Sequence, residues 1–209
     1  YNYSKGSWST GMMPPSHGGD SRFNSDRAHF MKPSNLLKIF LNAGKLKKEK
    51  RSGWVKSGVK NPESVADHSF RMALMALFLT PEKLDKSKVV NLCLIHDLAE
   101  AKTGDIITWK NHDMKKYEKK KLEQKAIKNI SNNKQLLNLW NEYEERETKE
   151  SKFAKQLDIL EMVLQAYEYK LDKKEDELNK YIDTFFKTGK QKINNPKLKK
   201  LLNEIFKLK

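Results

Sequence analysis

The sequence contains two long apolar segments with helical spacing, and each carries ionisable side chains in its interior. Residues 63–79 read ESVADHSFRMALMALFL, and residues 92–106 read LCLIHDLAEAKTGDI. The second segment places His96 and Asp97 side by side within its apolar face, with two further acids close behind. Burying a charge is costly unless the group is paired or bound to a metal ion. The pattern therefore predicts core helices that carry a polar or metal-binding site.

Helical spacing extends over almost every segment from Ser34 onward, and no hairpin signal interrupts it. Ser34 is expected to cap the first helix, with Leu37, Phe40 and Leu41 on its core side. The expected helices cover residues 34–45, 63–79, 85 or 87 to 104, 114–130, 134–148, 151–171, 176–187 and 196–207. The stretch RSGWVKSGVKNPES, residues 51–64, is rich in turn residues. The fold class predicted from this pattern is all-α, with the two nearly apolar helices at the centre.

Residues 1–33 differ in composition from the rest of the chain. They are rich in Gly, Ser and Pro and lack apolar periodicity, which predicts a flexible N-terminal extension or a cloning remnant. No apolar signal-peptide core is present, but a transit peptide stays open because the stretch is rich in Ser and poor in acids. Residues 34–209 are expected to form one domain, since a chain of 209 residues seldom makes two.

The composition argues against a membrane protein and for a reducing compartment. No run approaches the roughly 20 apolar residues that a membrane helix needs. The single cysteine, Cys93, cannot form an internal disulfide, which fits the cytoplasm. Because Cys93 lies inside an apolar run, we expect a buried and unreactive thiol.

The formal net charge of +15 raises the question of nucleic-acid binding. Only five of the 42 basic residues are Arg, and the lysines are spread along the chain and mixed with Glu, as in KKYEKKKLEQK. Joint enrichment in Lys and Asn is typical of coding bias in an AT-rich genome. We therefore interpret most lysines as solvated surface residues, although a basic surface could attract small phosphorylated substrates.

Four ionisable residues from three apolar helices form a consistent set, which we call the ligand set: His68, His96, Asp97 and Asp158. Asp158 lies mid-helix between Leu157 and Ile159, so it cannot serve as a helix cap. Two imidazoles and two carboxylates suit Mn, Fe, Co, Ni or Zn. The alternative is a buried polar network that holds the helices together. Asp67 could ligate in place of His68, or, as we expect, orient it through a hydrogen bond.

Three extended blocks resemble the HD-domain phosphohydrolases, and within them the 5′-deoxynucleotidases of the eukaryotic HD-domain-containing protein 2 type. These blocks are PESVADHSFRMALMAL, IHDLAEAKTGDI and SKFAKQLDILEMVLQAYEY, and the resemblance covers about residues 34–209. It implies a single HD-domain helical bundle with a metal site between its central helices. It also implies release of the 5′-phosphate from deoxyribonucleoside monophosphates, and a homodimer.

The resemblance assigns the ligand set to one divalent ion, which would be Mn, Co, Zn or Fe. It implies that Glu100 and Asp105 are catalytic residues that position the attacking water. These two acids and the carbonyl of Ile106 could also hold a second ion, for which Mg is a candidate. Without the resemblance, Glu100 would be interpreted as an ordinary exposed acid and Asp105 as a turn residue.

Arg51 and Trp54 are the expected substrate-binding residues. An Arg fork suits a phosphate, and the Trp ring could pack against sugar or base. The alternatives are a solvated Arg and a Trp that packs in the core. Lys56 and Lys60 are weaker candidates, and Arg71 could brace a carboxylate such as Asp67.

Two other functions stay open on the sequence alone. Another HD-domain hydrolase, acting on deoxynucleoside triphosphates or cyclic nucleotides, would use the same ligand set. A non-catalytic, Lys-rich nucleic-acid-binding protein would show steeply salt-dependent binding and no need for metal.

Overall fold

The computed structural model describes residues 31–107, 116–172, 178 and 180–208. The unit from Lys32 to Lys209 is all-α, as predicted, and its described residues contain no strand beyond an isolated bridge between Lys50 and Ser64. Its helices are α1 (Pro33–Lys45), α2 (Ser52–Lys56), α3 (Val65–Leu79), α4 (Lys86–Ile95), α5 (Glu100–Thr103), α6 (Lys116–Ile130), α7 (Lys134–Glu145), α8 (Lys149–Asp172), α9 (Asp183–Lys192) and α10 (Pro196–Leu208), with a 3-10 turn, η2 (Lys180–Ile182). The predicted extension, residues 1–33, lies almost entirely outside the described residues.

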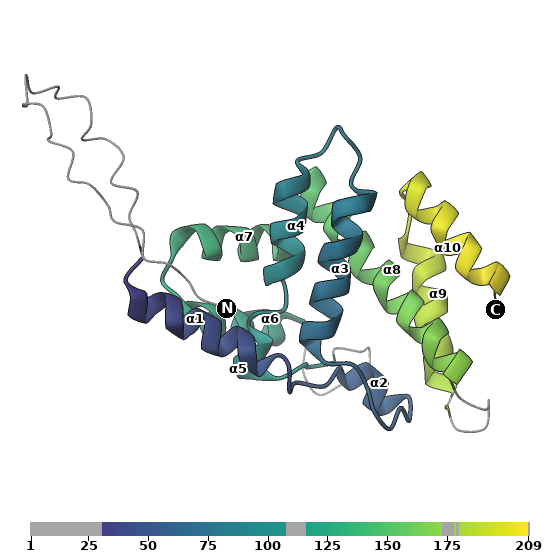
Figure 1. The fold of residues 1–209 in the computed structure, drawn as a ribbon, viewed down its shortest axis with the longest axis horizontal. Coiled ribbons are helices and arrows are strands. Elements are labelled where there is room, and N and C mark those ends of the chain that lie inside the picture. The colour runs from purple at the N-terminus through teal and green to yellow at the C-terminus, as the bar shows by residue number, and fades with distance from the viewer. Residues whose placement is uncertain (1–30, 108–115, 173–177, 179, 209) are drawn as a thin grey trace, which may run out of the picture. The chain divides into compact units, whose positions relative to one another are not determined.

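Helix α8 is the central element of this unit (Figure 1). The antiparallel pair α3 and α4 packs against it, as do α7, α9 and α10. A larger apolar core joins these helices, and a smaller one lies among α1, α6, α7 and the segment after α4. The two apolar helices expected at the centre are therefore in the core, but they share it with α8, which is longer and more polar. None of the described helices is both long and apolar enough to span a bilayer.

Helix α3 begins with a capping box. The Ser64 hydroxyl accepts a hydrogen bond from the Asp67 amide, and the Asp67 carboxylate accepts one from the Ser64 amide. That backbone hydrogen bond is the main cause that holds the pKa of Asp67 below its ordinary value. Asp67 therefore caps the helix, and the expectation that it orients His68 is wrong. The helix ends before Thr80 and Pro81, as predicted.

The segment predicted to be one helix from residue 85 to 104 is broken at the His–Asp doublet. Helix α4 is capped by the Asp85 side chain and ends at Ile95, and α5 begins only at Glu100. The turn between them carries His96 and Asp97, and both residues lie there close to His68 of α3. Gly104 then ends α5 with φ of 73° and ψ of 168°, a conformation almost restricted to glycine.

The start of α1 differs from the prediction. Lys32 precedes the helix without a side-chain cap, and Pro33 takes the first helical position, where its missing N–H costs nothing. The three residues expected on the core side are instead exposed: Leu37, Phe40 and Leu41. The opposite side, with Ile39 and Ala43, packs on the smaller core.

Three further boundaries were misplaced by the sequence pattern. The turn-rich stretch contains the short helix α2. The helix expected at residues 176–187 lies partly outside the described residues, and its described part from residue 180 is η2 followed by α9. Helix α7 ends at Glu145 because Arg146 takes a left-handed conformation, with φ of 57°. Cys93 is fully buried, as expected, and burial raises the pKa of its thiol.

Two helical glycines give a matched prediction of stability. A Cβ at Gly189 would lie 2.6 Å from Cγ2 of the buried Val163, whereas a Cβ at Gly44 meets no atom within 4 Å. Gly189→Ala should lower the free energy of unfolding by about 1–3 kcal/mol through overpacking. Gly44→Ala should be neutral or raise it by up to about 1 kcal/mol through helix propensity. Urea denaturation of both variants measures the difference, and equal effects would show that α9 does not pack on α8 as described.

Candidate metal centre

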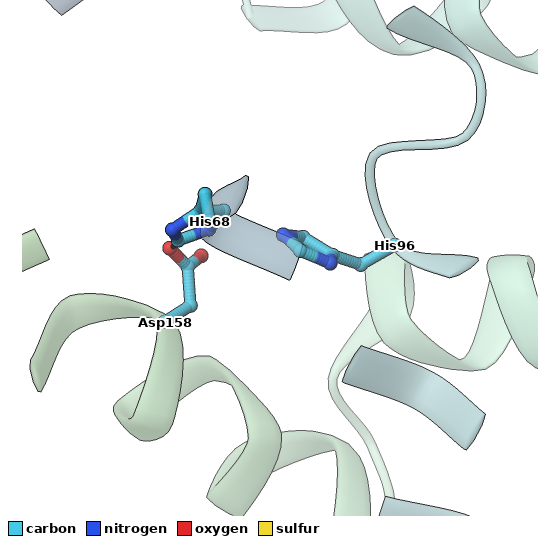
Figure 2. Close-up of side chains that lie close together, drawn as sticks. All are labelled: His68, His96 and Asp158. Carbon is cyan, nitrogen blue, oxygen red and sulfur yellow. Dashed lines mark ion pairs between the residues drawn. The ribbon is translucent and has the colours of Figure 1, made fainter. Parts of the chain in front are cut away.

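Three side chains from three separate elements converge at the centre of the fold. His68 lies on α3, His96 in the turn after α4, and Asp158 on α8 (Figure 2). One potential ligand atom from each lies within 4.8 Å of the other two. Nε2 of His68 is 3.5 Å from Oδ1 of Asp158, and the imidazole centroids are 5.3 Å apart. All three residues are buried, so the convergence is a property of the core.

The hydrogen bonds of the two imidazoles leave the same nitrogen free on each ring. Nδ1 of His96 donates to the Cys93 carbonyl at 2.8 Å, and Nδ1 of His68 donates to the Glu161 carboxylate. Neither buried Nε2 atom makes a hydrogen bond, although a carboxylate oxygen lies close to each, that of Asp158 beside His68 and that of Asp97 beside His96. A neutral imidazole that donates from Nδ1 carries its lone pair on Nε2, which is the arrangement that metal-binding histidines adopt. The donor set thus fits a divalent cation.

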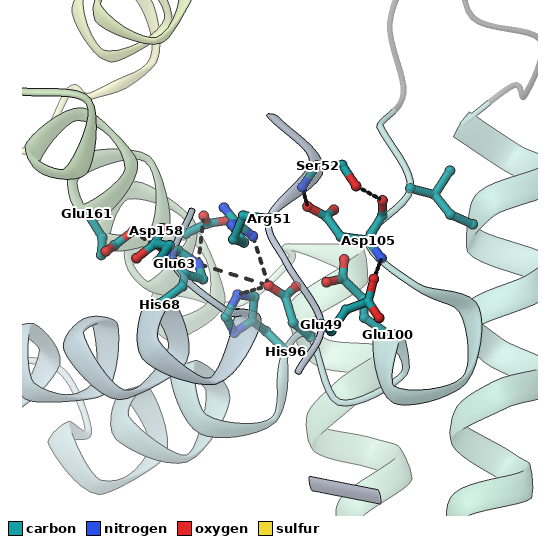
Figure 3. A network of polar contacts seen from close by, with 12 residues as sticks. Glu49, Arg51, Ser52, Glu63, His68, His96, Glu100, Asp105, Asp158 and Glu161 are labelled. Atoms are coloured by element: carbon teal, nitrogen blue, oxygen red, sulfur yellow. Dashed lines mark hydrogen bonds and ion pairs between the residues drawn. The ribbon is translucent and has the colours of Figure 1, made fainter. Parts of the chain in front are cut away.

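Asp97 completes the predicted ligand set. Its Oδ2 lies 2.9 Å from Nε2 of His96 and 4.0 Å from Nε2 of His68. The same oxygen accepts a hydrogen bond from Nη1 of Arg51 at 3.2 Å. The structure therefore brings the four predicted ligands into one cluster, of which Figure 3 labels His68, His96 and Asp158.

The electrostatics of the cluster favour positive charge between its carboxylates. Burial opposes the ionised form of Asp158, but Lys155 and His68 outweigh it and hold the pKa of Asp158 well below its ordinary value. Burial and the charge of Arg51 lower the pKa of His68, but the opposite effect of Glu161 and Asp158 is larger. The net result is a pKa of about 10, above the ordinary value of an imidazole. Either a proton on His68 or a bound divalent ion can neutralise the negative charge of these carboxylates.

Glu161 was missed by the sequence reasoning, although it lies one helical turn after Asp158. It is fully buried, and its carboxylate accepts hydrogen bonds from His68 and from Nε of Arg71, the latter at 2.8 Å. Arg71 also donates to Glu168 at 2.6 Å. Arg71 thus braces Glu161, and the suggested pairing with Asp67 is wrong. The spacing of three residues from a buried Asp was the signal that could have revealed Glu161.

Glu100, Asp105 and Ile106, predicted to be catalytic or to hold a second ion, lie beside the ligand set. Glu100 is only 3% exposed, and its Oε2 is buried without a partner. Burial, together with the charges of Asp97 and Asp105, raises the pKa of Glu100 well above its ordinary value. Asp105 is fixed by the amide of Ser52, which donates to its Oδ2 at 2.7 Å. The carbonyl of Ile106 accepts a hydrogen bond from an ammonium group, that of Lys119, at 2.9 Å.

Arg51 and Trp54 line a cavity of about 130 Å³ together with Asp105. Trp54 is 1% exposed, donates from Nε1 to Glu63 at 2.8 Å, and packs on Tyr169 and Phe185 in the core. The ring therefore has a packing role whether or not it touches a substrate. Arg51 is not a solvated surface residue, because it lies against Asp97.

Comparison with known sequences identifies clear relatives. The sequence profile of the HD-domain family matches residues 43–201. The protein named 5′-deoxynucleotidase HDDC2 in Dictyostelium discoideum is 40% identical over 183 residues, which cover 80% of this chain and 95% of that protein. The human protein of the same name is 40% identical over 178 residues, which cover 82% of this chain and 84% of that protein.

Solved structures share the arrangement of helices. A conserved hypothetical protein from Pyrococcus furiosus superposes with a TM-score of 0.69 at 32% sequence identity. The match covers 82% of this chain and 99% of the archaeal chain.

Proposed function

Because the chain belongs to the HD-domain family, we propose that it is a metal-dependent 5′-deoxynucleotidase. It would hydrolyse deoxyribonucleoside monophosphates to the deoxynucleoside and inorganic phosphate. The relatives named 5′-deoxynucleotidase, 40% identical over about four fifths of the chain, support this reaction. The HD-domain match over residues 43–201 supports the phosphohydrolase class.

One observation carries the proposal: the buried imidazoles of His68 and His96 turn their Nε2 atoms, which make no hydrogen bond, toward the buried carboxylate of Asp158. A divalent ion bound there supplies Lewis-acid chemistry, which makes a nearby water more acidic and offsets the charge of a phosphate. Asp97 is the fourth ligand. Mn, Co, Zn and Fe all suit this set of nitrogen and oxygen donors.

The chain's own residues supply the proton transfer and the phosphate contacts. Glu100, whose pKa is raised by burial and by the charges of Asp97 and Asp105, is the base that takes the proton of the attacking water. Asp105, held by Ser52, orients that water for in-line attack. Arg51 offers its guanidinium to the phosphate oxygens, which stabilises the charge that develops in the transition state. Trp54 forms the wall of the adjoining cavity and limits where the sugar can lie.

A panel of nucleotides separates this reaction from the alternatives. We expect inorganic phosphate from deoxynucleoside monophosphates in the presence of Mn²⁺. Release of triphosphate from deoxynucleoside triphosphates, or opening of cyclic nucleotides, would instead indicate another HD-domain hydrolase. Metal-independent, steeply salt-dependent binding of nucleic acid without any hydrolysis would favour the Lys-rich binding protein.

A homodimer is part of the proposal, and α3 offers a surface for it. Four apolar side chains on α3 are exposed: Phe70, Leu74, Leu77 and Phe78, at 68%, 45%, 48% and 71%. Their spacing places them along one side of the helix, and apolar patches of this kind mark protein interfaces. A second copy of the chain would bury them.

The double variant Leu74→Glu, Phe78→Glu should therefore be monomeric in light scattering, while the unchanged protein has twice the mass of one chain. Leu171→Glu, at an exposed position on α8, is the control and should leave the mass unchanged. A monomeric unchanged protein would remove the dimer from the proposal.

A further inference from the structure

The lysine-rich start of α6 places one ammonium group inside the site. We propose that Lys119 supplies, from the protein itself, the positive charge that a second metal ion would bring to Glu100 and Ile106. The centre would then bind one divalent ion per chain, and Lys119 would be a positioning residue for Glu100. This inference rests on the proposed function, and it takes the position of a second ion, at Glu100, Asp105 and Ile106, from the resemblance to the HD-domain family.

The contacts of Lys119 coincide with the oxygens that a second ion would use. Its Nζ donates to the Ile106 carbonyl at 2.9 Å and lies 3.5 Å from Oε1 of Glu100. It also lies 3.3 Å from Oε1 of Glu123, four residues along α6. The ammonium group, which has three N–H donors, therefore makes one hydrogen bond and two ion pairs here.

A metal ion and this ammonium group cannot share these oxygens without a large repulsion. Mg²⁺ and Ca²⁺ bind oxygens at roughly 2.0–2.6 Å, which would place a divalent charge directly beside the ammonium nitrogen. Two such charges a few ångströms apart repel strongly in a region shielded from water. Binding of a second ion would therefore require Lys119 to leave.

Burial makes that departure costly. The Lys119 side chain is 21% exposed, and the carboxylates of Glu100 and Glu123 are 3% and 9% exposed. Glu100 also lies near the charges of Asp97 and Asp105. Without the ammonium group, buried carboxylates would face one another uncompensated, which is among the most destabilising changes a core can undergo. Lys119 therefore differs from the solvated lysines of the same segment.

When the ammonium group of Lys119 occupies the position of a second ion, the two nearby acids are not needed as metal ligands. Glu100 and Asp105 are left to act on the water and the phosphate instead of serving as metal ligands. The positive charge beside Glu100 also does not depend on the concentration of free divalent ions.

The experiment measures Mn²⁺ stoichiometry on metal-free protein by isothermal titration calorimetry without nucleotide. We expect one tightly bound Mn²⁺ per chain in the unchanged protein and in Lys119→Arg, which keeps the charge. Lys119→Gln should bind a second Mn²⁺ at least tenfold more tightly than the unchanged protein does. Lys121→Gln, at an exposed position two residues away, should behave as the unchanged protein.

Two tight ions of similar affinity in the unchanged protein would overturn the inference, and this arm needs no variant to fold. An unchanged second-site affinity in folded Lys119→Gln would overturn it as well. A failure of the proposed function looks different. In that case the chain would bind one ion, yet release no phosphate from any deoxynucleoside monophosphate.

Discussion

Replacing Asp97 with Asn is expected to lower phosphate release from deoxynucleoside monophosphates by roughly a thousandfold, because metal catalysis is worth several kcal/mol and each 1.4 kcal/mol is tenfold. The amide keeps the shape of the carboxylate but not its charge. That charge lies 2.9 Å from Nε2 of His96 and 3.2 Å from Arg51. The variant loses a metal ligand and the partner of the phosphate-binding guanidinium. Phosphate release is measured with and without added Mn²⁺, and circular dichroism reports the fold.

Asp85→Asn is the matched control for this substitution. Asp85 caps α4 through the Lys88 amide, and Asn caps helices as well as Asp does. The control should keep both activity and melting temperature. Turnover of folded Asp97→Asn at the unchanged rate would remove Asp97 from the ligand set.

Replacing Glu161 with Gln is expected to weaken metal binding by about 10–100-fold, the usual cost of losing a group that orients a metal-binding imidazole. Glu161 touches no substrate in this account, so it is a positioning residue that acts through His68. Its neutral isostere keeps the volume but no longer favours the Nδ1–H form of the ring. The affinity for Mn²⁺ is measured by competition with a chelator, and activity should return at high Mn²⁺.

Glu168→Gln separates orientation of His68 from simple loss of an Arg71 partner. Glu168 pairs with Arg71 at 2.6 Å, is 42% exposed, and makes no contact with His68 among those the structure records. It should leave the Mn²⁺ affinity unchanged. Equal losses in the two variants would mean that Arg71, and not the orientation of His68, controls the site.

The cluster of buried ionisable residues could be predicted from the sequence because an ionisable residue inside an apolar helix leaves few physical options. His68, His96 and Asp158 each interrupt a segment that is otherwise suited to the core, and the structure buries all three. Helical spacing likewise predicted most helices, since the apolar faces of α3 and α8 are fixed by their own residues. These features are local, so they can be read from one stretch of chain at a time.

The features that the sequence pattern missed depend on contacts between distant segments. The break between α4 and α5 lies in an apolar run whose periodicity continues through it, and at that break His96 contacts His68 on α3 and Tyr143 on α7. Glu161 meets a histidine 93 positions away in the chain. Lys119 looks like its lysine neighbours until α6 packs on α5. The exposed side of α1 is apolar for reasons that the described chain alone does not supply.

The central claim is that hydrolysis depends on one divalent ion held by the ligand set. The most direct measurement removes metal with a chelator, adds Mn²⁺ back in known ratios, and follows phosphate release from deoxyadenosine monophosphate. The account predicts no release from the chelated protein and a rise in rate that saturates at one Mn²⁺ per chain. Full activity in protein shown by elemental analysis to be free of metal would contradict it.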